Sequence, residues 1–368
     1  MDIGIVGGSI AGCTAAIMLK RNGHRVSVFE RSTGTLVGRG GGIGTTTTLY
    51  NEILDQDLID RTMPSMDILR MPFVGKHNLS EPFGKTAWSL AIDFKVFQWA
   101  DLWSSLRRRV SDSEYKEGKK ITGVKDTDEG RVQLTVENGE KHEYDLVLFA
   151  DGYNSFGREI LFPEKKLNYR GYVLWRGLLP ERDINSTCKI DHDILRLSYN
   201  KAPGHNVLYF IPDADGSASP GSRLFNWAAY IPVPEKELKE VMTDKFGVVR
   251  KGTVPPGLLH PRTENRFKEF LSRHMPKFFS EIIEKTSDSY IQNIYTLDLD
   301  QYYKQNSCLI GDAGMVVQPF TGSGVFKGYH NVKDLIQCLS IYNTKEKALD
   351  QWNQLQLNNC KKLLTLGE

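Results

Sequence analysis

Short apolar runs alternate with amphipathic segments at both ends of the chain. The runs Ile3–Val6, Tyr144–Ala150 and Ser307–Ile310 predict buried parallel strands, because a strand that is covered on both faces has no polar face. A helix is predicted from Cys13 to Asn22, followed by a second strand at Arg25–Phe29. This strand–helix–strand order predicts an α/β fold.

The middle of the chain has a different pattern, in which apolar and polar positions alternate. Such alternation predicts antiparallel strands with one covered face. The predicted strands are Leu69–Val74, Tyr172–Leu178, Ile194–Ser198, Asn206–Ile211 and Arg223–Ile231, and the predicted flanking helices are Pro234–Thr243 and Glu264–Lys285. We therefore expect a discontinuous first domain of residues 1–65, 85–160 and 285–368 with helices at its C-terminal end, and an inserted second domain of residues 66–84 and 161–284.

The turn after the first predicted strand has the spacing of a dinucleotide-binding fingerprint. Gly7 and Gly8 allow a sharp turn, and Gly12 lets the following helix pack close to the strand. Ser9 stands where the fingerprint has its second glycine, and its hydroxyl can donate to a phosphate. The N-terminus of the helix favours a pyrophosphate. The predicted cofactor contacts here are Gly7, Gly8, Ser9, Ile10, Ala11 and Gly12.

An acidic residue ends the second predicted strand. Glu30, with Arg31 beside it, lies where a carboxylate accepts hydrogen bonds from the ribose of a dinucleotide. A 2′-phosphate would be repelled there, so the site favours FAD or NAD over NADP.

Two further motifs follow predicted strands, where ligands of open α/β sheets bind. One contains Asp151, Gly152, Ser155 and Arg158; the other is Gly311-Asp312-Ala313, followed by a Pro-x-x-Gly-x-Gly stretch at residues 319–324. Together with the fingerprint, they resemble the signatures of the single-component FAD-dependent aromatic hydroxylases, the para-hydroxybenzoate hydroxylase-like class. That class has a Rossmann-like FAD-binding domain with an inserted antiparallel-sheet substrate domain.

The resemblance extends through the middle of the chain and implies roles for individual residues. Segments 171–181, 224–227, 240–247 and 255–257 are similar to the dihydroxypyridine branch of the class. By resemblance, Asp312 binds the ribityl chain of FAD, Asp151 is associated with FAD and the reduced nicotinamide, and Arg39 in a glycine-rich loop approaches FAD. The remaining expected FAD contacts, at the start of the helix after Pro319, are Gly322, Ser323 and Gly324.

The activity that the resemblance implies is hydroxylation of an electron-rich aromatic or N-heteroaromatic ring. FAD would be reduced transiently by NADH or NADPH and would react with O2 through a flavin C4a-hydroperoxide. The predicted catalytic residues are Pro319, Arg176 and His205, and the predicted substrate contacts are Trp175, Tyr209, Trp227 and Phe320. The alternatives are an exposed turn residue for His205 and a place in the core for the aromatic residues.

Three other functions fit the same cofactor motifs. One is a monooxygenase that inactivates a larger xenobiotic or antibiotic. Another is a flavin-dependent halogenase, although residues 227–232 lack the second Trp of the halogenase motif. The third is a non-catalytic flavin-binding protein, which would not need the glycine-rich stretch 319–324.

The composition of the chain excludes some kinds of binding partner. The 368 residues carry a formal net charge of +2 with no long basic tract, which argues against nucleic acid as a partner. The five cysteines are scattered without metal-ligand spacing, and no apolar run reaches the ~20 residues of a membrane span. We expect a cytoplasmic protein whose oligomeric state is open, a homodimer being one option.

Overall fold

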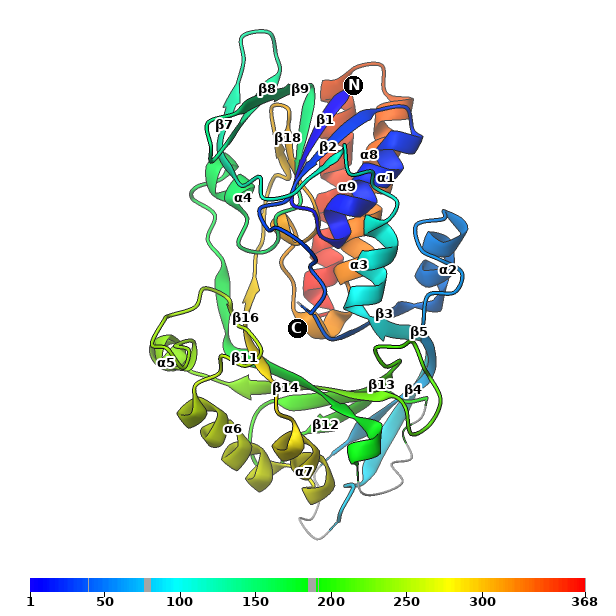
Figure 1. The fold of residues 1–368 in the computed structure, drawn as a ribbon, viewed down its shortest axis with the longest axis vertical. Helices are drawn as coiled ribbons and strands as arrows, with labels where there is room; N and C mark the ends of the chain where they lie inside the picture. The colour runs from blue at the N-terminus through cyan, green and yellow to red at the C-terminus, as the bar shows by residue number, and fades with distance from the viewer. Residues whose placement is uncertain (39, 76–80, 185–189, 191, 368) are drawn as a thin grey trace.

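The computed structural model describes residues 1–38, 40–75, 81–184, 190 and 192–367. Within these residues the strands form three sheets, two of them large (Figure 1). The strands of the first sheet are β1 (Asp2–Val6), β2 (Arg25–Phe29), β6 (Tyr115–Lys116), β10 (Leu146–Phe149), β17 (Tyr303–Lys304) and β18 (Ser307–Leu309). Their order is β17-β18-β10-β1-β2-β6, and β1 runs parallel to both β10 and β2. The predicted α/β fold is confirmed.

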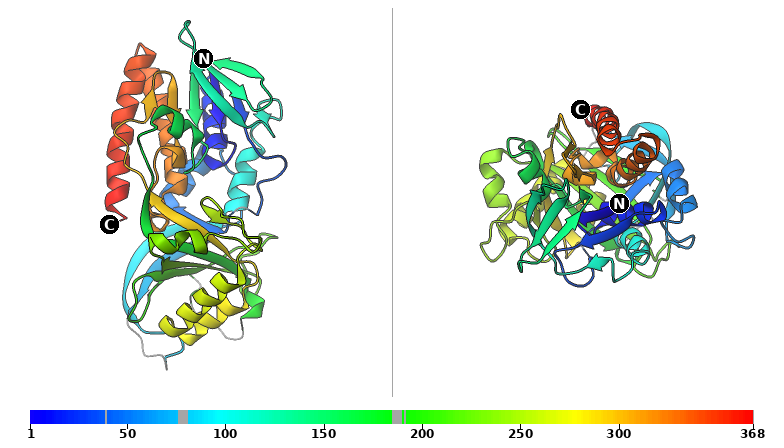
Figure 2. Two further views of the ribbon diagram at one scale, coloured as in Figure 1. Left: turned by 90° about the vertical axis from the view of Figure 1, so that its left-hand side faces the viewer. Right: turned by 90° about the horizontal axis from the view of Figure 1, so that it is seen from above.

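Helices and a small sheet enclose this first sheet. The helices of the same part of the molecule are α1 (Ile10–Arg21), α2 (Thr47–Asp55), α3 (Trp99–Arg107), α4 (Phe156–Leu161), α8 (Gly324–Ile341) and α9 (Lys345–Thr365). The small sheet consists of β7 (Ile121–Asp126), β8 (Val132–Val136) and β9 (Lys141–Tyr144). In Figure 2, α8 and α9 lie on one side of β1 and β2, and the small sheet lies on the other. Among the described residues, no helix is long and apolar enough to cross a membrane.

The second large sheet has mostly antiparallel neighbours. Its strands are β3 (Gly42–Thr46), β4 (Met66–Val74), β5 (Thr86–Gln98), β11 (Asn168–Pro180), β12 (Leu195–Ser198), β13 (His205–Ile211), β14 (Leu224–Pro232), β15 (Thr253–Val254) and β16 (Tyr290–Thr296). The order is β15-β16-β11-β14-β13-β12-β4-β5-β3. The flanking helices are α5 (Glu235–Val241), α6 (Pro261–His274) and α7 (Lys277–Lys285). The helix predicted at Glu264–Lys285 is two helices, because Pro276 cannot continue the first.

The two sheets divide the chain differently from the predicted domain boundaries. β3, β5 and β16 come from segments that were expected in the first domain, but they pair with strands of the second sheet. We propose that each large sheet marks one domain, with these three strands in the second. Figure 1 shows α6 and α7 below the second sheet, while its upper face turns toward the first domain.

Candidate active site

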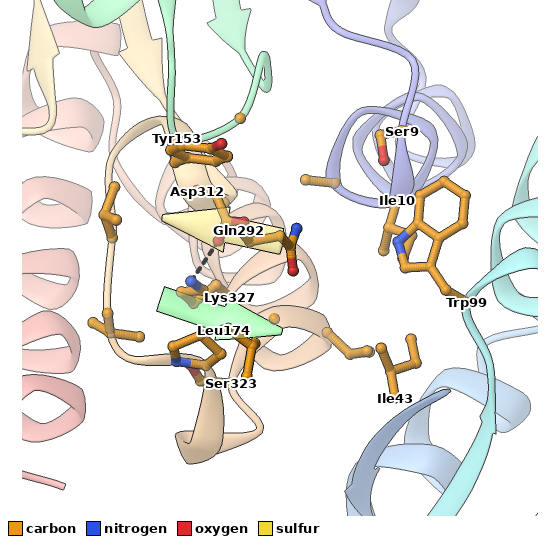
Figure 3. A pocket seen from close by; sticks show the side chains of 18 of the residues that line it. Ser9, Ile10, Ile43, Trp99, Tyr153, Leu174, Gln292, Asp312, Ser323 and Lys327 are labelled. Carbon is orange, nitrogen blue, oxygen red and sulfur yellow. Dashed lines mark hydrogen bonds and ion pairs between the residues drawn. The ribbon is translucent and has the colours of Figure 1, made fainter. Parts of the chain in front are cut away.

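A cavity of about 870 Å³ lies between the two large sheets. One wall contains the fingerprint turn, the Asp151 loop and Asp312 from the first domain. The other wall is the upper face of the second sheet, and residues 316–325 line the space between them. Figure 3 shows Ser9 and Ile10 facing Asp312 and Lys327 across this space. The cavity therefore joins the predicted dinucleotide site and the predicted substrate sheet in one enclosure.

The N-terminus of α1 opens into the cavity. Ser9 is the N-cap of α1, and its side chain makes no capping hydrogen bond, so its hydroxyl is available to a ligand. Gly7 has φ +106°, and a Cβ on Gly12 would lie 1.8 Å from the carbonyl oxygen of Gly7. Only glycine fits at either position. Gly8 and Gly12 do not line the cavity but allow the close packing behind it, where the Tyr115 hydroxyl donates to the carbonyl oxygen of Gly8.

Glu30 lies at the end of β2 and is 6% exposed. Its two carboxylate oxygens accept hydrogen bonds from the backbone N–H groups of Gly8 and Ser32, both at 2.9 Å. A carboxylate has about four lone-pair sites, so Glu30 can accept further bonds from ribose hydroxyls. Arg31 also lines the cavity. Arg39, the remaining predicted contact of this region, lies outside the described residues.

The two predicted aspartates lie on loops that Arg158 ties together. The guanidinium of Arg158 donates to the backbone carbonyls of Ala313 and Tyr153. Asp151 accepts a hydrogen bond from the N–H of Gly157 at 3.2 Å through Oδ2, while its buried Oδ1 has no partner among the described residues. Burial raises the pKa of Asp151 above its ordinary value. An unpartnered buried oxygen beside the cavity fits a ligand that donates a hydrogen bond there.

The stretch after Asp312 brings a second helix N-terminus to the cavity. Pro319–Thr321 is a short 3₁₀ turn, and its C-cap Gly322 has a φ of +65°, the left-handed conformation that glycine favours. Gly324 begins α8, and its N-cap Ser323 makes no side-chain capping bond to the helix. Pro319, Phe320, Gly322, Ser323 and Gly324 all line the cavity. The positive end of α8 therefore faces the site.

The floor of the cavity is a row of residues across four neighbouring strands. Arg176 on β11 pairs with Ala228 on β14, Ala228 pairs with Val207 on β13, and Val207 pairs with Arg196 on β12. Directly paired residues share a face of the sheet, and all four line the cavity. Two small side chains thus lie between two guanidiniums. The predicted contact Tyr209 also lines the cavity.

Trp175 and Trp227, which we predicted to contact the substrate, lie on the opposite face of the sheet. Both rings are fully buried; their centroids are 5.0 Å apart, and Trp175 also packs against Phe267 of α6. The indole N–H of Trp227 donates to the hydroxyl of Thr286 at 3.0 Å. Successive strand residues face opposite sides, so Trp175 faces the helices because Arg176 faces the cavity. These two predictions are corrected: both indoles belong to the core.

His205 does not line the cavity, and it is not an exposed turn residue either. It begins β13, where its ring stacks on Tyr230 with centroids 4.4 Å apart and meets Phe320 edge-on at 5.7 Å. Burial, with a contribution from Arg196, lowers the pKa of His205 to about 3. A histidine of such low basicity is a poor general base at neutral pH, so the geometry does not support the predicted catalytic role.

The cavity is also lined by residues that were not among the predicted contacts, including Trp99, Arg196 and Lys327. Trp99 begins α3, and its ring lies beside Gly40. Lys327 lies on a helix, where a sequence pattern alone indicates a solvated lysine, and only the fold shows that it is 4% exposed. Arg196 alternates with apolar neighbours, and the pattern does not tell which face is covered.

The residues present fit FAD. An open helix N-terminus suits the pyrophosphate, Glu30 suits a ribose, and the unpartnered oxygen of Asp151 and the cavity-facing Asp312 supply further acceptors. These features lie along one continuous cavity. Its shape and donor set therefore suit an extended dinucleotide with a planar ring between the two sheets.

Comparison with known proteins agrees with this assignment. The family model for pyridine nucleotide-disulphide oxidoreductases matches residues 1–173, and the FAD binding domain-like model matches residues 169–296. These matches support an assignment to the FAD-dependent monooxygenases of the aromatic hydroxylase class.

Individual relatives support the same class. The chain is 27% identical to 2,6-dihydroxypyridine 3-monooxygenase from Paenarthrobacter nicotinovorans, across 96% of this chain and 87% of that protein. The solved structure of 2,6-dihydroxypyridine-3-hydroxylase from Arthrobacter nicotinovorans matches with a TM-score of 0.86 at 26% identity, covering 99% of this chain and 90% of that one. Klebsiella pneumoniae HpxO, solved with FAD and uric acid, shares the fold with a TM-score of 0.75 at 16% identity, covering 100% of this chain and 86% of that one.

Proposed function

We propose that this protein hydroxylates an electron-rich aromatic or N-heteroaromatic ring, with FAD as cofactor, NADH or NADPH as transient reductant and O2 as oxidant. The observation that carries the proposal is the single cavity in which the dinucleotide site and the floor between Arg176 and Arg196 meet the loop of Pro319. The name of the dihydroxypyridine relative supports a small heteroaromatic ring as the substrate class.

The first domain holds the cofactor in this proposal. Ser9 and the N-terminus of α1 bind the pyrophosphate, Glu30 binds a ribose, and Asp312 binds the ribityl chain. Bound FAD supplies the activation of O2 and the transfer of one oxygen atom to the ring. The N-terminus of α8 stabilises negative charge at the edge of the cavity that it faces.

The second domain positions the substrate. The ring lies on Ala228 and Val207, with Tyr209 beside it. Arg176 donates from one end of this floor; its Nη2 is already fixed by the carbonyl oxygen of Gly42 at 2.6 Å, while its Nε is buried without a partner among the described residues. A guanidinium favours the ionised form of a ring hydroxyl, which makes the ring carbons more electron-rich. Pro319 and Phe320 also line the cavity, and in this proposal they help to exclude water from the substrate.

A larger substrate is the second candidate, favoured by one feature of the sheet. Beyond Arg196, the row of paired residues continues through Phe73 to Trp88. The rings of Phe73 and Trp88 stack with centroids 3.7 Å apart, and Trp88 is 55% exposed. This aromatic surface adjoins the cavity and suits an apolar extension of the ring.

The test starts with the absorbance spectrum of the purified protein, which we expect to show the visible bands of oxidised flavin. NADH and NADPH oxidation is then measured with hydroxypyridines, phenols, hydroxybenzoates and alkyl-substituted hydroxyquinolines. We expect one ring class to stimulate oxidation and to yield a product that incorporates isotopic label from O2. A protein that binds no flavin even after reconstitution with FAD, or oxidation that no ring stimulates, would overturn the proposal. Stimulation by the alkylated compounds alone would select the larger-substrate alternative.

A further inference from the structure

Lys327 is a buried cation in an unfavourable place. It lies in the first turn of α8, where its backbone N–H donates to the carbonyl oxygen of Ser323 at 2.9 Å. The positive end of a helix repels a cation, and burying an ammonium is costly unless it is paired. The side chain is nevertheless 4% exposed. The ammonium of Lys327 therefore needs partners that offset the cost of its burial and of its repulsion by the helix end.

The ammonium of Lys327 pairs with Asp312, a residue that we predicted to contact the cofactor. Its Nζ donates to Oδ1 of Asp312 at 2.5 Å (Figure 3). It also donates to the carbonyl oxygen of Met315 at 2.9 Å. These contacts use two of the three donors of an ammonium. Both side chains line the cavity, and the side chain of Asp312 remains 51% exposed toward it. The pair is thus part of the cavity wall that we propose to contact FAD.

The ion pair of Asp312 and Lys327 has no net charge. Asp312 alone would place a full negative charge in the cavity beside the N-terminus of α8 and would offset the partial positive charge of that helix end, which is roughly half an elementary charge. Lys327 cancels the carboxylate. The partial positive charge of the helix end is then left to act on the ligand. Because the effective dielectric constant inside a protein is lower than that of water, this difference acts more strongly on a ligand in the cavity than it would in bulk solvent.

We propose that Lys327 is a positioning residue that neutralises Asp312 and so raises the reduction potential of bound FAD. The inference rests on the FAD site of the proposed function. A reduced nicotinamide transfers a hydride to FAD; the nicotinamide is oxidised, and the flavin gains two electrons, one proton and one negative charge. Lys327 stabilises this reduced, anionic state relative to the neutral oxidised flavin, because it removes the repulsion from Asp312.

The experiment measures the reduction potential of the holoprotein by equilibration with a reference dye, together with the dissociation constant for oxidised FAD. In Lys327→Met we expect affinity for reduced flavin to fall about tenfold relative to affinity for oxidised flavin, which lowers the potential by about 30 mV for a two-electron couple. Lys333→Met is the matched control. It removes a lysine from the same helix that is 44% exposed and pairs with Glu52 outside the cavity, and it should leave the potential unchanged.

Two further variants separate the charge effect from a structural one. Lys327→Arg keeps the charge and should retain the potential, whereas Lys327→Gln should lower it as Met does. The double variant Lys327→Met/Asp312→Asn removes both charges and should return the potential toward the native value. An unchanged potential in the Met and Gln variants that still bind FAD, or a double variant as low as Lys327→Met, would overturn the inference. None of these readouts requires hydroxylation, so a failed ring assay would refute the proposed function alone.

Discussion

His205 makes the folded protein less stable as the pH falls. Its ring is stacked on Tyr230, and burial lowers its pKa from 6.5 to about 3. The native protein therefore keeps His205 neutral at pH values where the unfolded chain protonates it. Because the unfolded state binds more protons between pH 6.5 and pH 3, His205 reduces stability progressively as the pH falls through this window.

The size of the effect follows from the two pKa values. At pH 8 neither state is protonated on His205, so the contribution to the free energy of unfolding is near zero. At pH 5 protonation of the unfolded chain costs about 2 kcal/mol of stability. This loss of stability depends almost entirely on the unfolded-state pKa, because pH 5 lies well above the native pKa of about 3.

The assay compares urea unfolding of the wild type and of His205→Phe at pH 5, 6, 7 and 8. Phenylalanine retains a flat ring against Tyr230 but has no titratable group. We expect the difference in unfolding free energy between pH 8 and pH 5 to be about 2 kcal/mol smaller in the variant. Equal pH dependence in the two proteins would refute the reasoning. So would a histidine resonance, identified by its loss in the variant, that titrates near pH 6.5 in the native protein.

Three other predictions follow from single contacts. Gly12→Ala forces a Cβ to within 1.8 Å of the carbonyl oxygen of Gly7. We expect the free energy of unfolding, followed by thermal unfolding, to fall by about 1–3 kcal/mol and FAD to separate from the protein on gel filtration. Full retention of FAD would contradict this. Glu30→Gln replaces a carboxylate that accepts two backbone bonds and should weaken FAD binding about tenfold in titrations of the apoprotein. Trp227→Phe breaks the bond to Thr286 and should lower stability by about 1–3 kcal/mol without changing KM for the ring substrate; a raised KM would restore Trp227 to the substrate site.

The cofactor half of the site could be predicted from the sequence because its determinants are local. Gly7 and Gly12 are needed by one turn between a strand and a helix, and Glu30 ends the next strand. Asp312 likewise follows a strand directly. In each case the spacing along the chain sets the position in space, so the motif and the geometry agree.

The substrate half depends on packing that the sequence does not encode locally. Trp175 and Arg176 are neighbours on β11, and alternation shows that they face opposite sides. Which side is the cavity depends on where α6 and α7 pack, and these helices come about ninety residues later in the chain. Lys327 was missed for a related reason: its burial results from the meeting of α8 with the Asp312 loop.

The pairing of β1 with distant strands has a consequence for how the protein is made. β1 pairs with β10, and β10 pairs with β18, which ends at Leu309. A chain that leaves the ribosome from its N-terminus therefore carries β1 and the fingerprint turn with an incomplete sheet until most of the chain has been synthesised. The FAD site closes only after Asp312 emerges. For the proposed FAD site, we therefore expect the cofactor to load only late in synthesis or in the released chain, when every residue that lines the cavity is already present.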